Sequence, residues 1–157
     1  CGIILTKPVY RYRKEKSKFV VLASDHAGFK LKEEIKKFLI RKREKVLDLG
    51  TKNNSSVDYP DYAHLLSKRI LKAKDQFGIL VCGSGAGMSM AANKHKNIRA
   101  ALCYDVKSTK LSRLHNNANV MTIGARLTKK KIALKCVSTF LNTSFEGGRH
   151  SRRIKKI

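Results

Sequence analysis

The chain has 157 residues, a hydrophobic fraction of 42% and a formal net charge of +24 at pH 7. This length and apolar content fit one domain with a core of its own. No apolar run approaches the roughly 20 residues that a membrane-spanning helix needs, which argues against a spanning segment among these residues.

The positive charge arises from 35 Lys and Arg residues against 11 Asp and Glu residues. It indicates either affinity for nucleic acid or another anionic partner, or lysines that cover solvated helix faces. No recognition helix, zinc finger or aromatic-studded sheet accompanies the charge, so we expect no specific nucleic-acid partner. A field of this sign also steers an anionic substrate toward the protein.

The four cysteines, Cys1, Cys82, Cys103 and Cys136, show neither metal-site spacing nor a CxxC pair. They favour a reducing compartment without a disulfide framework, and we expect a cytoplasmic protein. We interpret residues 1–18 as a basic, flexible tail, with the remnant of an organelle-targeting segment as the alternative. A single domain then covers residues 19–157.

Apolar strands alternate with amphipathic helices from residue 19 onward. Strands are expected at Phe19–Ala23, Val46–Gly50, Ile79–Val81, Ile98–Cys103 and Val120–Gly124. Tyr59-Pro60 opens the second helix, because proline is accepted in a first turn. Asp105 and Thr128 are the expected N-caps of two later helices. The order predicts an α/β fold, a Rossmann-like three-layer αβα sandwich with a five-stranded parallel sheet.

In such sheets, ligands bind outside the carboxyl ends of the strands. Three polar stretches are expected there, namely Asp25-His26, Cys82–Gly87, and the residues from Asp105 toward His115. We therefore expect the binding site at this edge.

The stretch Cys82–Gly87 joins a buried strand to the start of a helix and contains three glycines. Free N–H groups at such a start favour an anion, and a thiol placed there is prone to ionise. The spacing fits neither a Walker loop nor a full G-x-G-x-x-G fingerprint. Taken alone, Cys82 is as readily interpreted as a small buried hydrophobe.

Several separate motifs, in order along the chain, resemble the type B ribose-5-phosphate isomerases. The wider family includes the galactose-6-phosphate isomerase subunits. The matching segments are Ser24–Lys32, Asp58–Pro60, Cys82–Gly87 with Ala91–Lys94, Leu111–Asn116, and Gly147–His150. The resemblance covers about residues 19–157 and leaves out residues 1–18.

The resemblance implies an aldose–ketose isomerase that interconverts D-ribose 5-phosphate and D-ribulose 5-phosphate through an enediolate, with no metal or organic cofactor. It implies Cys82 as the base, Ser84 as a proton shuttle and His115 as the acid and base of ring opening. One branch of the family has a glutamate where Met88 stands and lacks the cysteine. This chain therefore resembles the branch with a cysteine base.

The resemblance also implies a homodimer, and possible pairing of dimers into a tetramer, with each active site shared and the C-terminal arginines supplied by the partner. The implied substrate-binding residues are Asp25, His26, Tyr59, Gly83, Gly85, Gly87, Asn116, Arg126, Arg149 and Arg153. Without the resemblance, Asp25 is equally an N-cap, and His115 and single arginines are ordinary surface residues. Two alternatives stay open: an isomerase of a hexose 6-phosphate such as allose or galactose 6-phosphate, and a non-catalytic module that binds anions or nucleic acid.

Overall fold

The computed structural model describes residues 19–73 and 76–157. The expected tail, residues 1–18, lies outside the described residues. Along the chain the elements are β1 (Val20–Ser24), α1 (Phe29–Arg41), β2 (Val46–Asp48), α2 (Tyr59–Leu71), β3 (Phe77–Cys82), α3 (Ala86–Ala92), β4 (Ala100–Leu102), α4 (Val106–Asn116), β5 (Val120–Gly124), α5 (Lys130–Asn142) and α6 (Arg149–Ile154). None of the helices in the described part is long and apolar enough to cross a bilayer.

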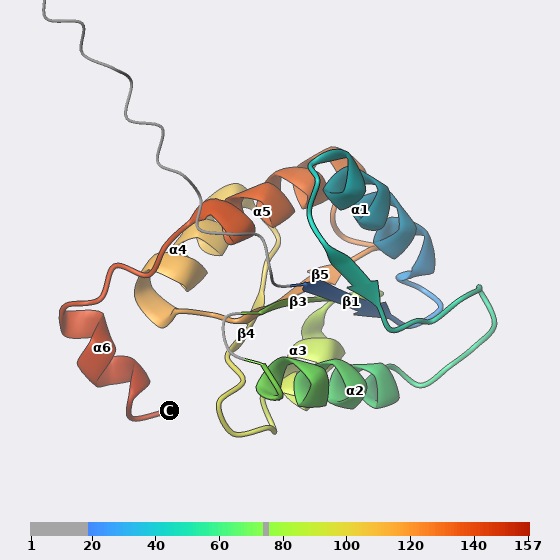
Figure 1. Cartoon of the computed structure of the whole chain (residues 1–157). Helices are drawn as coiled ribbons and strands as arrows, with labels where there is room; N and C mark the ends of the chain where they lie inside the picture. The colour runs from blue at the N-terminus through green and yellow to red at the C-terminus, as the bar shows by residue number, and fades with distance from the viewer. Residues whose placement is uncertain (1–18, 74–75) are drawn as a thin grey trace, which may run out of the picture.

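The five strands form one parallel sheet in the order β2-β1-β3-β5-β4. Helices α1, α4 and α5 lie on one side of it, and α2 and α3 lie on the other (Figure 1). This confirms the predicted three-layer sandwich. The chain leaves β1 toward β2 and then crosses to β3, so the strand order reverses between β1 and β3. Such a reversal is where open α/β sheets bind ligands.

Two apolar cores, one on each face of the sheet, hold the layers together. Alternate residues of β1 divide between them, because side chains along a strand point to opposite faces. Val20 and Leu22 join the core under α1 and α5, whereas Val21 and Ala23 join the core under α2 and α3. Cys82 belongs to the second core.

The predicted helix starts are confirmed in two of three cases. The Asp105 carboxylate accepts a hydrogen bond of 2.6 Å from the N–H of Ser108 and caps α4. Helix α2 begins at Tyr59 with Pro60 in its first turn. Thr128 was the wrong choice for α5, because Lys129 occupies the N-cap position and no side chain caps that helix.

Strand β4 is shorter than the expected Ile98–Cys103. The Arg99 N–H donates to the side chain of Asn119 at 2.8 Å instead of joining the strand ladder. Strand β2 likewise ends at Asp48, where the Asp48 carboxylate accepts from the N–H of Gly50 at 2.9 Å and turns the chain.

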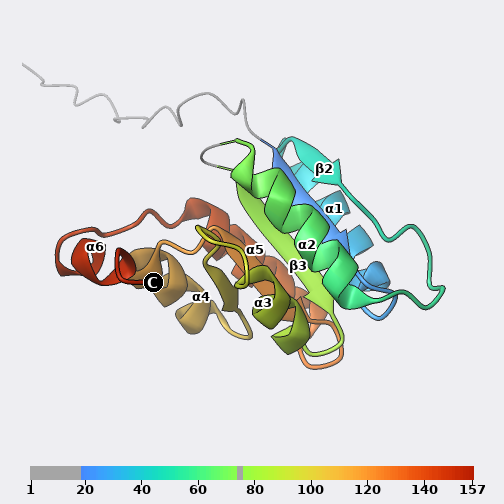
Figure 2. The same cartoon turned by 90° about the horizontal axis from the view of Figure 1, so that it is seen from below.

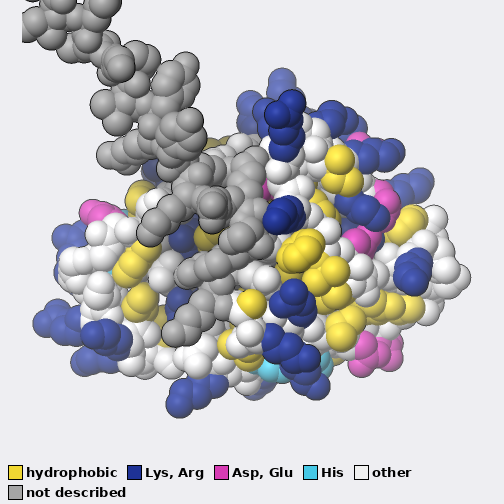
Figure 3. All heavy atoms as spheres, in the orientation of Figure 1, with side chains coloured by type: hydrophobic (Ala, Val, Ile, Leu, Met, Phe, Trp, Pro, Cys, Tyr) yellow, Lys and Arg dark blue, Asp and Glu magenta, His cyan; other side chains and the backbone are white. Residues whose placement is uncertain are grey.

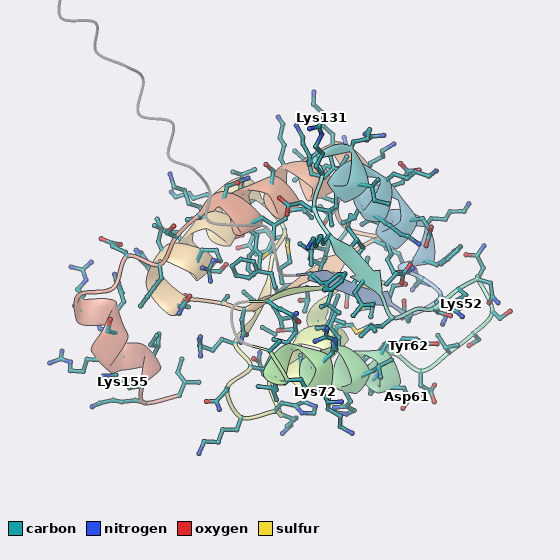
Figure 4. All side chains as sticks on the ribbon, in the orientation of Figure 1. Lys52, Asp61, Tyr62, Lys72, Lys131 and Lys155 are labelled. Atoms are coloured by element: carbon teal, nitrogen blue, oxygen red, sulfur yellow. The ribbon has the colours of Figure 1, made fainter. Side chains whose placement is uncertain are left out.

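Lys and Arg side chains project around much of the face shown in Figure 3 and do not gather over one element there. Three of the four lysines labelled in Figure 4, Lys72, Lys131 and Lys155, extend from different helices or their ends and point away from the body. On this face the positive charges therefore lie on solvated surface, in line with the interpretation that lysines cover solvated helix faces.

Candidate active site at the carboxyl edge of the sheet

A cavity of about 350 Å³ opens at the carboxyl ends of β1 and β3. Its lining comes from four loops or helix starts: Asp25, His26, Ala27, Tyr59, Cys82, Gly83, Ser84, Gly87, Arg126 and Leu127. Eight of the expected site residues are therefore brought together by one chain. Ala27 and Leu127 were not predicted, because neither carries a polar group that would mark it in the sequence.

The Cys82 thiol stands at the end of β3, with the residue only 4% exposed. Its sulfur accepts a hydrogen bond of 3.1 Å from the N–H of Gly85. Gly85 reaches this position with φ +80°, a conformation that glycine adopts without steric cost. The loop backbone thus holds an N–H donor against the sulfur.

Backbone donors surround the thiol. Within the described residues, no acceptor contacts the N–H groups of Gly83 and Gly87, as expected at the start of a helix. The N–H of Ala86 is taken by the Ser84 hydroxyl at 3.3 Å, and Ser84 itself is exposed. The loop thus offers free N–H groups and one hydroxyl beside the sulfur.

Asp25 and His26 line the cavity from the end of β1. Asp25 is 6% exposed, and its carboxylate accepts from the N–H of Gly28 at 2.9 Å, so it both stabilises the start of α1 and faces the cavity. His26 Nδ1 accepts from the N–H of Val57 at 3.2 Å. The neutral ring then carries its hydrogen on Nε2, which leaves that nitrogen as a donor.

Tyr59 and Arg126 form two further walls. A Cβ added to Gly87 would lie 2.6 Å from Tyr59 Cζ, and one added to Gly83 would lie 3.1 Å from an Arg126 guanidinium nitrogen. Tyr59 therefore packs directly against Gly87, where a side chain could enter only if the ring moved, and Arg126 lies close against Gly83. The Arg126 N–H also donates to the carbonyl of Gly83 at 3.0 Å, which ties the end of β5 to the loop.

Gly85, also expected, does not line the cavity itself, but its N–H contacts the Cys82 sulfur. The remaining expected residues, His115, Asn116, Arg149 and Arg153, do not line this cavity either. Helix α4 starts beyond the carboxyl end of β4 and runs back toward the amino edge of the sheet. His115 and Asn116 lie in its last turn, and Asn119, three residues later, accepts from the N–H of Gly78 near the start of β3. Cys82 is at the opposite end of β3, about 13 Å further along the strand.

The expectation that His115 joins Cys82 at one edge of the sheet was therefore wrong within a single chain. The eleven residues of α4 carry His115 away from Asp105, which does lie at the carboxyl edge. Helix α6, with exposed Arg149 and Arg153, packs beside α4 and far from the end of β3 (Figure 2).

His115 forms a second cluster with Glu146 and His150. The two imidazole rings stack with centroids 4.3 Å apart and an interplanar angle of 16°. The Nε2 atoms of both rings lie 3.8 Å from Glu146 Oε2. Burial, together with the nearby His115 and Arg149 charges, holds the pKa of His150 below its ordinary value. Only the packing of α6 on α4 creates this cluster.

Comparisons with known proteins find relatives along most of this chain. The family model described as Ribose/Galactose Isomerase matches residues 20–157. Ribose-5-phosphate isomerase B of Escherichia coli is 39% identical over 140 residues, covering 89% of this chain and 94% of that protein. The crystal structure of a ribose 5-phosphate isomerase from Thermotoga maritima has a TM-score of 0.87 and 49% identity, covering 89% of this chain and 97% of its own.

A second solved structure holds a ligand. Ribose-5-phosphate isomerase B from Mycoplasma genitalium with bound ribulose-5-phosphate has a TM-score of 0.86 and 44% identity, and it covers 89% of this chain and 93% of its own.

Proposed function

The chain belongs to the ribose/galactose isomerase family, and we propose that it interconverts D-ribose 5-phosphate and D-ribulose 5-phosphate with Cys82 as the base. The observation that carries this assignment is the placement of a thiol, free backbone donors and an arginine around one cavity. A buried cysteine with a purely structural role needs none of these neighbours.

The reaction moves two hydrogens. In the open-chain aldose, the Cys82 thiolate takes the proton from C2, and the electron pair forms the C1–C2 double bond of an enediolate. The protonated Cys82 then delivers a proton to C1, while the hydroxyl proton on O2 passes to O1, so the net change is a ketone at C2. Ser84 beside the sulfur is placed to carry the hydroxyl proton.

The developing oxyanion needs donors that are in place before the reaction. The N–H groups of Gly83 and Gly87 have no acceptor in the described part of the chain, and both residues line the cavity together with Cys82. Asp25, His26 and Tyr59 bind the sugar hydroxyls from the opposite wall. Arg126 offers a planar guanidinium, which suits a phosphate group.

Ring opening requires a further acid and base, which we assign to His115, with Asn116 holding a sugar hydroxyl and Arg149 and Arg153 holding the phosphate. A single chain leaves these four side chains away from Cys82, so we propose that they reach the cavity from the partner subunit of a homodimer.

Three exposed apolar side chains, two of them on elements that line the cavity, support this dimer. Met90 on α3 is 70% exposed, Tyr104 after β4 is 62% exposed, and Leu127 at the cavity rim is 75% exposed. Large apolar groups so close to a binding site indicate an interface.

The test replaces Cys82 with alanine. General-base catalysis contributes about 100- to 10,000-fold, so we expect turnover of ribose 5-phosphate to fall by at least about 100-fold. Cys103→Ala is the matched control, because Cys103 is also a buried thiol but lies outside the cavity, and burial raises its pKa to about 11. Turnover within tenfold of the unmodified protein in Cys82→Ala would show that another group is the base.

Deuterium exchange isolates the proton transfer. Ribulose 5-phosphate needs no ring opening, so its C1 hydrogen should exchange with D₂O in the unmodified protein and in His115→Ala, but not in Cys82→Ala. Loss of exchange in His115→Ala alone would move His115 into the enediolate step.

A hexose 6-phosphate is the second candidate substrate, because the matched family covers galactose as well as ribose. The kcat/KM values for ribose 5-phosphate, allose 6-phosphate and galactose 6-phosphate decide between the two candidates. A higher value for either hexose phosphate would replace the pentose assignment.

A further inference from the structure

Three metal-binding side chains converge away from the thiol cavity. His115 comes from the last turn of α4, Glu146 from the connection before α6, and His150 from α6 itself. One ligand atom from each lies within 4.8 Å of the others. The backbone fixes the arrangement, because the N–H of Glu146 donates to the carbonyl of Leu114 at 3.1 Å.

The buried member of the cluster lacks a partner. The His150 side chain is 7% exposed, and no group in the described part of the chain makes a hydrogen bond to its Nε2 atom. Glu146 Oε2 is 3.8 Å away, which is beyond hydrogen-bond range. A buried polar nitrogen left unmatched is costly and rare in native structures. Its position facing Glu146 indicates that a further group fits between them.

We propose that His115, Glu146 and His150 form a Zn²⁺ site that inhibits the isomerase by occupying the Nε2 lone pair of His115. Two imidazoles and one carboxylate are a ligand set that zinc accepts, with the fourth position left for water. The inhibition, unlike the binding, rests on the role in ring opening proposed above for His115.

The geometry needs only local adjustment. Zinc with bonds of about 2.0–2.1 Å in a tetrahedral arrangement separates its ligand atoms by about 3.4 Å. Both histidine nitrogens lie 3.8 Å from the Glu146 oxygen. The parallel rings cannot both point at one ion, so His115, whose side chain is 38% exposed, must turn out of the stack, while buried His150 stays in place.

The surrounding charge selects the kind of ion. Arg149 and Arg153 act on His150, and their positive field disfavours cations held by charge alone. Magnesium and calcium prefer all-oxygen sites, whereas zinc bonds strongly to neutral imidazole. The cluster therefore favours zinc and similar transition metals over magnesium and calcium.

Binding is measured by titration calorimetry with ZnCl₂ on the Cys82→Ala full chain, so that the cavity thiol cannot bind the metal. We expect Zn²⁺ affinity to fall by about tenfold or more in the additional variants Glu146→Gln and His150→Asn. Glu34→Gln is the matched control, because Glu34 is another partly exposed carboxylate but belongs to α1, where it pairs with Lys130 at the start of α5. Equal affinity in all variants would overturn the site, and so would the absence of binding.

Inhibition is measured on chains that keep Cys82, each relative to its own activity after EDTA treatment. Zinc should inhibit the unmodified chain reversibly, and Glu146→Gln should need about tenfold more zinc for the same fractional loss. Equal sensitivity of the two would refute the inhibitory role. Because calorimetry needs no turnover, a chain that binds zinc as expected but lacks isomerase activity would refute the proposed function and leave the metal site standing.

Discussion

The Cys82 sulfur and the Gly85 N–H are 3.1 Å apart, and this contact exists only because Gly85 adopts φ +80°. The left-handed residue turns the loop back so that its N–H points at the end of β3. The proposed base is therefore positioned by the backbone of its own loop and not by another side chain.

Gly85→Ala should lower the melting temperature by more than the strain of a positive φ alone would. An added Cβ would lie 2.6 Å from Leu102 Cδ1 and 2.9 Å from the carbonyl carbon of Ile123, which belongs to strand backbone. We expect a lower melting temperature and at least a tenfold loss of kcat, about 1.4 kcal/mol, as the thiol loses its donor. Gly147→Ala is the control for stability, since Gly147 has φ +74° and its added Cβ meets nothing nearer than 3.8 Å.

The melting temperatures of both variants, measured by calorimetry, decide the point. An equal decrease in the two would mean that the crowding at Gly85 is relieved without cost.

Local patterns in the sequence predicted the sheet, its parallel strands and the loop Cys82–Gly87, because strand and helix periods are set by neighbouring residues. They placed His115 wrongly, since the position of a residue at the end of a helix depends on the helix's direction and length as well as on its loop. The contact of Glu146 and His150 with His115 depends on how α6 packs against α4. That packing leaves no periodic signal in six helical residues.

The ion pair between Lys32 and Asp48 should dominate the stability of the edge near β2. Lys32 is 1% exposed, and its Nζ lies 2.7 Å from an Asp48 oxygen. Asp48→Asn would leave the buried ammonium group with only the more exposed Glu33, at 2.9 Å, as a counter-charge, and we expect unfolding free energy to fall by about 3 kcal/mol in urea denaturation. Lys32→Met should cost less, because it removes the charge and keeps the bulk. A smaller loss in Asp48→Asn than in Lys32→Met would contradict this account.

The same pair predicts a dependence on acid. Burial opposes ionisation of Asp48, but hydrogen bonds from Lys32, the Gly50 N–H and Lys36 outweigh it and hold the pKa of Asp48 below its ordinary value. As the pH falls, Asp48 is therefore protonated in the unfolded chain before it is protonated in the folded chain. The stabilisation is present above about pH 4 and is lost as the pH falls further. Melting temperatures between pH 5 and pH 3 should decline more steeply in the unmodified protein than in Asp48→Asn. Parallel curves would refute the assignment.

His64 on α2 and His95 after α3 share one short contact, with Nδ1 of His64 2.7 Å from Nε2 of His95. Burial, followed by the charges of His64 and Lys68, lowers the pKa of His95. The unfolded chain binds the proton more readily, with a pKa of about 6.5, so stability should fall as the pH drops below that value. His95→Gln keeps an acceptor and should flatten the melting temperature between pH 7 and pH 5. An unchanged slope would show that this pair does not titrate on unfolding.

Mixing two inactive variants tests the shared active site. Cys82→Ala lacks the proposed base, and His115→Ala lacks the proposed ring-opening group. If each site takes Cys82 from one subunit and His115 from the other, a mixed dimer has one intact site. Random exchange of subunits in an equal mixture should then restore about a quarter of the unmodified activity toward ribose 5-phosphate.

A site made within one chain predicts no such recovery, because every chain in the mixture carries one defect. The double variant Cys82→Ala/His115→Ala mixed with the unmodified protein provides the matched control, since a mixed dimer of these two has no intact site if sites are shared and one if they are not. Sedimentation confirms that the variants still associate. Two results together would show that the site is shared: recovery in the first mixture, and a fall to about a quarter of the unmodified activity in the second. Cys82 and His115, which lie at opposite ends of the sheet in one chain, would then act together only across the subunit interface.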